Sequence, residues 1–295
     1  RSTATNEESL FSRKYGFCDR GSIGKGATAI VRLAHKMDST GPRKTEKLFA
    51  IKEFRPRRKD ETEREYVKKL TAEFCISSTL HHPNVVETVD LIQDEHGHWC
   101  EVMEYCMGGD LYSVIRDGHM TPLEAECCFK QLIRAVNYLH SMGVAHRDIK
   151  PENCLLDDRS RLKLTDFGVS DVFRMAWETE AHTSRGMCGS EPYIAPEVFT
   201  NKPYDARCVD VWACGIVLYA LYMRGVPFRC ATKSDPVYVK YLDCFNSRDA
   251  SYEGFRRLPV GAKSLLMKML NPDPIERITI TEIIKDSWFT SIMVC

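Results

Sequence analysis

The sequence His-Arg-Asp-Ile-Lys-Pro-Glu-Asn runs from His146 to Asn153, and Asp166-Phe167-Gly168 follows after twelve further residues. The first stretch contains a carboxylate, Asp148, and a cation, Lys150, and it ends on the amide of Asn153. Carboxylate and amide oxygens are the ligands that Mg²⁺ prefers, and a carboxylate beside a cation can orient a hydroxyl group while the cation offsets negative charge. Either motif alone arises by chance, but the two together at this spacing indicate phosphoryl transfer.

Both stretches resemble the catalytic loop and the magnesium-binding motif of the eukaryotic protein kinases. The resemblance implies that Asp148 orients the hydroxyl group of the substrate and that Lys150 offsets the charge on the migrating phosphate. It also implies that Asn153 and Asp166 bind Mg²⁺ and help to hold ATP. Because tyrosine-specific kinases differ at the position of Lys150, the expected acceptor is a Ser or Thr of a protein.

The resemblance extends from Tyr15 to the end of the chain and implies an α+β, bilobal protein-kinase fold. A small N-terminal lobe, residues 15–105, is expected to contain an antiparallel five-stranded sheet and one helix. A larger, mainly helical C-terminal lobe is expected at residues 106–295. Residues 1–14 are polar and lack apolar periodicity, so we expect a flexible tail there.

The composition excludes some classes of protein. With 41 Lys and Arg and 41 Asp and Glu in 295 residues, the chain has no net charge, and nothing favours binding to nucleic acid. The 13 cysteines form no CxxC pair and no cluster with histidine, which suits a reducing, cytoplasmic location. The longest apolar run, Val211 to Met223, is shorter than the roughly 20 residues of a membrane span, so we expect no transmembrane segment. A chain that starts at Arg1 is expected to be a piece of a longer protein.

A glycine-containing hairpin is expected near the start of the small lobe. Gly24 and Gly26 would let backbone N–H groups approach the phosphates of ATP, which side chains would block. The kinase pattern has a third glycine where this chain has Ala29, and a loose GxG is common in hairpins, so this motif alone is weak. The resemblance further implies that four apolar residues line the ATP site: Ile23, Val31, Ala50 and Leu155.

A lysine, Lys52, lies inside the apolar strand expected at residues 48–54. A buried ammonium group needs an anionic partner. In the resemblance its partners are the ATP phosphates and Glu73, which lies on a helix expected from Asp60 to Leu80. The alternatives are that Lys52 reaches solvent from an edge strand and that Glu73 is ordinary helix surface.

Residues 99–105, expected to form a strand, and the Gly108-Gly109 pair that follows resemble the kinase hinge. The resemblance implies that Met103 guards the back of the adenine pocket and that the Glu104 carbonyl and the Cys106 amide bind adenine. It implies that Asp110 meets the ribose. A plain interdomain linker is the alternative for the two glycines.

The segment from Val169 to Ser190 resembles a kinase activation segment, and it carries hydroxyl groups on Thr179, Thr183 and Ser184. A phosphate placed on Thr183 or Ser184 by an upstream activating kinase could pair with Arg147. The alternative is that these are solvated loop hydroxyls. Ser190 lies where the family places a hydroxyl that contacts Asp148 and Lys150.

Three further residues have structural roles in the resemblance. Glu197 and Arg277 resemble a buried ion pair that ties the activation segment to the larger lobe. Asp210 is expected to be the N-cap of the apolar helix and to brace the backbone of the catalytic loop. A separate basic cluster, Arg55 to Lys59 with Arg64, Lys68 and Lys69, is expected to be a solvated surface, with docking or phosphate sensing and nuclear import as alternatives.

A narrower likeness rests on residues 171–178, 188–197 and 210–215 and on the terminal Val294-Cys295. These stretches resemble the fungal kinases of the halotolerance and nitrogen-permease-reactivator group, which regulate plasma-membrane ion and nutrient transporters. We therefore expect a serine/threonine protein kinase that uses ATP and Mg²⁺. The alternatives are a pseudokinase scaffold and a small-molecule kinase of the same fold. Asp110 and Glu152 could favour basic residues before the target hydroxyl, although ribose contact and solvation explain them equally well.

Overall fold

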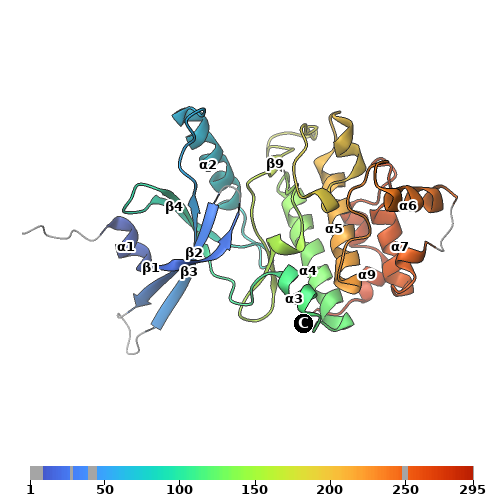
Figure 1. The fold of residues 1–295 in the computed structure, drawn as a ribbon, viewed down its shortest axis with the longest axis horizontal. Helices are drawn as coiled ribbons and strands as arrows, with labels where there is room; N and C mark the ends of the chain where they lie inside the picture. Colours follow the sequence, from blue (N-terminus) through green and yellow to red (C-terminus); the bar gives the residue numbers. More distant parts are fainter. Residues whose placement is uncertain (1–8, 27–28, 39–44, 248–251, 295) are drawn as a thin grey trace, which may run out of the picture. The chain divides into compact units, whose positions relative to one another are not determined.

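The computed structural model describes residues 9–26, 29–38, 45–247 and 252–294 (Figure 1). The chain divides into two compact units. Unit 1 runs to His81 and resumes at Val86–Met107, and unit 2 comprises His82–Val85 and the chain from Gly108 onward. The short stretch belongs to unit 2 because the Asn84 side chain donates to the Gln131 side chain and to the Leu162 carbonyl over 2.9 and 2.8 Å. Unit 1 ends at Met107, so the boundary predicted after residue 105 lies two residues before the observed one.

Unit 1 is built on the expected antiparallel five-stranded sheet, with the strand order β1-β2-β3-β5-β4. Its strands are β1 (Phe17–Lys25), β2 (Ala29–Asp38), β3 (Thr45–Phe54), β4 (Thr88–Gln93) and β5 (Trp99–Glu104). Because side chains alternate along a strand, Phe49 and Ile51 of β3 face one side of the sheet and Ala50 and Lys52 the other. The helix α2 (Glu63–Ser77) contacts the Lys52 side through Leu70, which packs with Ala29 and Phe54.

The expected tail at residues 1–14 is wrong for the part that the structure describes, because a short helix, α1 (Leu10–Tyr15), lies there. Ser9 caps it, and Phe11 and Tyr15, four residues apart, are buried against the Phe49 side of the sheet. The Tyr15 hydroxyl also donates to the Asp90 carboxylate over 2.7 Å. Six residues are too few to show periodicity, and α1 is stabilised by this packing. Residues 1–8 lie outside the described residues.

Unit 2 is mainly helical, as expected (Figure 1). In α4 (Pro122–Ser141), Thr121 and Glu124 form a capping box at the predicted start. Two-stranded sheets join β6 (Val144–Ala145) to β9 (Asp171–Val172) and β7 (Cys154–Leu156) to β8 (Leu162–Leu164). The other α-helices described are α3 (Leu111–Asp117), α5 (Ala206–Met223), α6 (Pro236–Asn246), α7 (Val260–Met269), α8 (Ile280–Ile283) and α9 (Ser287–Ser291).

The long apolar helix α5 forms the centre of unit 2. It is the one helix of the described residues with the length and composition of a membrane span, but most of it is buried inside unit 2. The prediction that Asp210 caps it is wrong, because α5 begins at Ala206 and the Asp205 carboxylate accepts the Arg207 N–H. The side chain of Asp210 is fully buried within the helix, where it has a different task.

Candidate functional site

The catalytic-loop side chains of unit 2 converge on the Asp148 carboxylate. Lys150 Nζ donates to it over 2.8 Å and the Ser190 hydroxyl over 2.9 Å. Lys150 Nζ also donates to Ser190 Oγ over 2.8 Å, which closes a triangle of contacts. The positions predicted for Asp148, Lys150 and Ser190 therefore come together, and a hydroxyl, a carboxylate and a cation share one small region.

Asp210 holds the backbone of this loop. Its two carboxylate oxygens accept the N–H groups of His146 and Arg147 over 2.9 and 2.8 Å, and one of them also contacts His140 Nε2 over 2.9 Å. Arg147 has φ 68°, a left-handed conformation that costs free energy for a residue with a side chain. The bracing expected of Asp210 therefore maintains a strained loop directly before Asp148.

Asn153 and Asp166 are brought together by the pairing of β7 with β8. The Thr165 N–H donates to the Asn153 carbonyl over 2.9 Å, which places Asp166 beside Asn153. The Asn153 amide nitrogen donates to the Asp148 carbonyl over 2.9 Å, so its side-chain oxygen is the atom suited to a cation. Asp166 has φ 67°, again a left-handed conformation of a residue other than glycine. One carboxylate and one amide oxygen form a donor set that fits Mg²⁺.

In unit 1, Lys52 forms the expected ion pair with Glu73. The two side chains are 2.5 Å apart, and Lys52 is buried. This contact rules out the alternatives for the two residues, because Lys52 lies on a central strand, β3, and Glu73 faces the sheet. The ion pair holds the side chain of Lys52 in one position on the surface of the sheet.

The strand register places four of the expected nucleotide-binding residues of unit 1, Val31, Ala50, Lys52 and Met103, on one face of the sheet. Val31 lies opposite Lys52, and Ala50 lies opposite Met103. Gly24 lies opposite Val31, and Ile23 is half exposed beside it. Among the described residues, a Cβ atom on Gly24 or Gly26 would meet no atom closer than 3.6 Å, so packing within that part of the chain does not require these glycines. Ala29, the missing third glycine, is buried in the contact with α2.

The segment predicted to form the hinge follows β5, and Asp110 in this segment caps a helix. Glu104 ends β5, and Cys106 is buried shortly after it. The Asp110 carboxylate caps α3 by accepting the Ser113 N–H over 2.8 Å and the Ser113 hydroxyl over 3.1 Å. Leu155 forms a backbone bridge with Asp110, so these two predicted ligand residues of unit 2 are neighbours.

Arg147 points toward the activation segment. Its Nη2 atom donates to the Tyr204 hydroxyl over 2.8 Å, while its Nε is buried and has no partner among the described residues. Ser184 is 3% exposed, and its hydroxyl donates to the Asp171 carboxylate. Thr183 is exposed. Of the two predicted acceptors of an activating phosphate, Thr183 is therefore the accessible one.

The basic cluster between β3 and α2 is organised by one acid, Glu61. Arg55 contacts its carboxylate at 3.1 Å and Lys69 at 2.7 Å. The hydrogen bond from Arg55, followed by that from Lys69, lowers the pKa of Glu61 to about 2. Other residues of the cluster, such as Arg58 and Lys59, are exposed, in agreement with the expected solvated surface.

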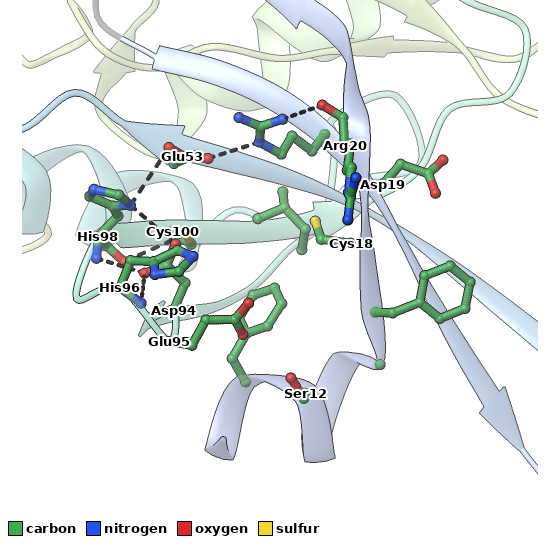
Figure 2. Close-up of a pocket in the computed structure, with 15 residues that line it drawn as sticks. Ser12, Cys18, Asp19, Arg20, Glu53, Asp94, Glu95, His96, His98 and Cys100 are labelled. Carbon is green, nitrogen blue, oxygen red and sulfur yellow. Dashed lines mark hydrogen bonds and ion pairs between the residues drawn. The ribbon is translucent and has the colours of Figure 1, made fainter. Parts of the chain in front are cut away.

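A cavity of about 450 Å³ lies on the other face of the unit 1 sheet, where α1 and the turn between β4 and β5 form its walls (Figure 2). It contains Glu53 and His98 but neither Lys52 nor Glu73. Burial raises the pKa of Cys18 to about 11 and that of Cys100 to about 12, so both remain thiols at neutral pH. This cavity is separated from the ion pair by the thickness of the sheet, because odd and even residues of β3 face opposite ways.

The comparisons agree with the site geometry. A family described as the protein kinase domain matches residues 17–289. The chain is 50% identical over 288 residues to the serine/threonine-protein kinase hal4 of Schizosaccharomyces pombe, covering 97% of this chain and 45% of that protein. It is 46% identical over 297 residues to HAL4/SAT4 of Saccharomyces cerevisiae, covering 99% and 49%, and 35% identical over 345 residues to oca2 of S. pombe, covering 100% and 52%.

The chain thus spans about half the length of the curated relatives it matches. Over that half, the match includes the catalytic loop, the lysine–glutamate pair and the activation segment described above. The chain belongs to the protein kinase family and is similar to the serine/threonine-protein kinases of the fungal Hal4 group.

Proposed function

We propose that the chain transfers the γ-phosphoryl group of ATP to Ser or Thr hydroxyls of proteins. The observation that carries this proposal is the triangle formed by Asp148, Lys150 and Ser190. A substrate hydroxyl beside Asp148 would meet a carboxylate that orients it and accepts its proton, while Lys150 would stabilise negative charge on the transferred phosphoryl group. Ser190 fixes both side chains in place.

The ATP phosphates are bound in this proposal by Lys52 and by the backbone of the glycine hairpin. Glu73 keeps the Lys52 ammonium group in position, which reduces the entropic cost of binding. Adenine is held by Val31, Ala50 and Met103 and by the hinge backbone of Glu104 and Cys106. Mg²⁺, held by Asn153 and Asp166, would neutralise charge on the phosphates when bound. Asp110, whose carboxylate caps α3, would reach the ribose only through its remaining hydrogen-bonding capacity.

The test is transfer of labelled γ-phosphate from Mg-ATP to a degenerate Ser/Thr peptide library, with Asp148→Asn as the inactive comparison. Label on peptides with the unchanged chain alone supports the proposal. Measurable ATP binding without transfer, even after treatment with an activating kinase, would favour a pseudokinase scaffold. Label on a sugar or another small molecule and on no polypeptide would favour a small-molecule kinase.

The physiological setting is a second part of the proposal. The likeness to the halotolerance group supports a cytoplasmic kinase that regulates plasma-membrane ion and nutrient transporters, with an upstream activating kinase acting on Thr183. Comparison of phosphorylated transporter peptides in cells with and without Asp148→Asn tests this setting. Unchanged transporter phosphorylation would contradict it and leave the catalytic proposal intact.

A further inference from the structure

A buried carboxylate that sequence patterns did not single out lies on the Lys52 side of the unit 1 sheet. Glu101, on β5, is 2% exposed and lies directly opposite Lys52 of β3. Side chains opposite each other in an antiparallel pair share one face. Glu101 therefore faces α2, the helix that carries Glu73.

Two hydroxyl groups donate to one oxygen of this carboxylate. The Ser77 hydroxyl donates to Glu101 Oε1 over 2.6 Å, and Thr88, the first residue of β4, donates to the same oxygen over 3.4 Å. Ser77 is the last residue of α2 and is 3% exposed. Its contact with Glu101 is shorter than the 3.2 Å contact of the same hydroxyl with the Phe74 carbonyl of its own helix, and it lies away from water, where hydrogen bonds are strong.

Two pairs of polar side chains therefore connect α2 to the sheet. Glu73 and Ser77 are four residues apart and lie on the same side of α2. Their partners, Lys52 and Glu101, face each other across adjacent strands. An apolar contact in place of the Ser77–Glu101 hydrogen bond would let the helix slide along the sheet. A short hydrogen bond instead fixes one position of the helix.

We propose that Ser77 and Glu101 are positioning residues for catalysis: their hydrogen bond sets the position of α2 and so holds Glu73 against Lys52. The inference rests on the proposed function, in which Lys52 binds the phosphates of ATP. Neither residue touches a reacting atom. Loss of the bond lets α2 shift and leaves Lys52 less well placed.

The test compares Ser77→Ala with Ser77→Thr. Ser77→Ala removes the donor and should lower kcat/KM for ATP about tenfold, the effect of one lost hydrogen bond to a charged group. Ser77→Thr keeps the hydroxyl and should restore most of the activity. Thr71→Ala is the matched control, because the Thr71 hydroxyl lies on the same helix but donates to its own helix, at the Val67 carbonyl over 2.8 Å.

A double-mutant cycle separates positioning from general stability. In a chain that already carries Glu73→Gln, Ser77→Ala should cost less than about twofold, because the pair through which it acts is already broken. A purely structural role would give the same fold-loss in both backgrounds. Glu101→Gln, which keeps an oxygen acceptor for Ser77, should fall between wild type and Ser77→Ala, and it serves as the second probe if Ser77→Ala does not fold.

Wild-type kcat/KM in Ser77→Ala, or equal losses with and without Glu73→Gln, would overturn the inference. A wild-type chain that binds ATP but transfers no phosphate would instead refute the proposed function. In that case the same cycle is measured in the dissociation constant of ATP, where coupling between Ser77 and Glu73 still decides the inference.

Discussion

Glu197 and Arg277, eighty residues apart, form a two-point ion pair with distances of 2.6 and 2.9 Å. Arg277 is 3% exposed, and it also donates to the Asn271 and Cys208 carbonyls. Arg277→Met should therefore lower the free energy of unfolding by about 3–5 kcal/mol, because it leaves the Glu197 carboxylate, whose side chain is only 11% exposed, unpaired. Urea unfolding measures this loss. Arg256→Met, at an exposed arginine, is the control, and a loss below about 1 kcal/mol at Arg277 would contradict the structural role.

Asp148→Asn should reduce phosphate transfer at least a hundredfold, roughly the contribution of a positioned acid–base group, while ATP binding persists. The amide cannot accept the proton of a substrate hydroxyl. Asp158→Asn changes an exposed carboxylate of the following turn and should leave the rate unchanged. Retained activity in Asp148→Asn would mean that another group orients the hydroxyl. The rate is measured with the peptides selected from the library.

Phe11→Ala should destabilise the chain by about 3–5 kcal/mol, because Phe11 is 4% exposed and its removal leaves a cavity between α1 and the sheet. Phe17→Ala is the matched control. Phe17 is 59% exposed and stacks on His35 at the surface, so its loss should cost less than about 1 kcal/mol. Thermal unfolding of both variants is the measurement, and equal losses would show that α1 does not pack stably on the sheet.

The lowered pKa of Glu61 predicts that the stability of the fold depends on pH. Its pKa in the folded chain is lowered from 4.5 to about 2, chiefly by the hydrogen bonds from Arg55 and Lys69. A lowered folded-state pKa stabilises the fold above the unfolded pKa, and this contribution is lost as the pH falls toward the folded value. The difference in unfolding free energy between wild type and Glu61→Gln should be constant above about pH 5 and shrink below about pH 4.

Glu63→Gln, at an exposed carboxylate two residues further along the chain, the first residue of α2, is the control for the pH series. It should give a small difference from wild type that varies little with pH. Urea unfolding at each pH supplies the values. A difference for Glu61→Gln that grew on acidification would contradict the assigned ion pairs.

Activation by an upstream kinase should depend on Thr183 more than on Ser184. Thr183 is exposed, whereas the Ser184 hydroxyl is buried against Asp171 and its backbone pairs with Tyr204. Thr183→Ala should therefore abolish the phosphate found in the segment by mass spectrometry, and Ser184→Ala should not. Phosphate on Ser184 in the active wild-type chain would show that this part of the segment opens during activation.

The loop around Asp148 could be recognised because its polar residues are close together in the sequence. Asp148, Lys150 and Asn153 lie within six residues, so their order alone identifies the loop. The pairing of Lys52 with Glu73 was also predicted: a lysine in an apolar strand requires an anionic partner, and the resemblance to kinases singled out Glu73. One of the two roles predicted for Asp210 is confirmed, because its side chain contacts the backbone of the loop. The other is wrong, because the N-cap of α5 is Asp205, five residues before Asp210.

The missed features depend on contacts between distant segments. Ser77 and Glu101 are polar residues at ordinary positions of a helix and a strand, and only the packing of α2 on the sheet brings them together. Likewise, α1 depends on the tertiary contact of Tyr15 with Asp90, about which a six-residue pattern carries no information. The capping of α3 by Asp110 was not predicted, because it appears only once the start of the helix is known.

The position of α1 has a practical consequence for anyone who prepares this domain. The family match begins at residue 17, after the last residue of the helix, so a boundary drawn from the family alone would remove it. Such a truncated chain would expose Phe49 and Ile51, two apolar side chains that α1 helps to cover. Poor yield or aggregation of that fragment would then reflect where it was cut, and recombinant versions should begin at or before Ser9, the residue that caps the helix.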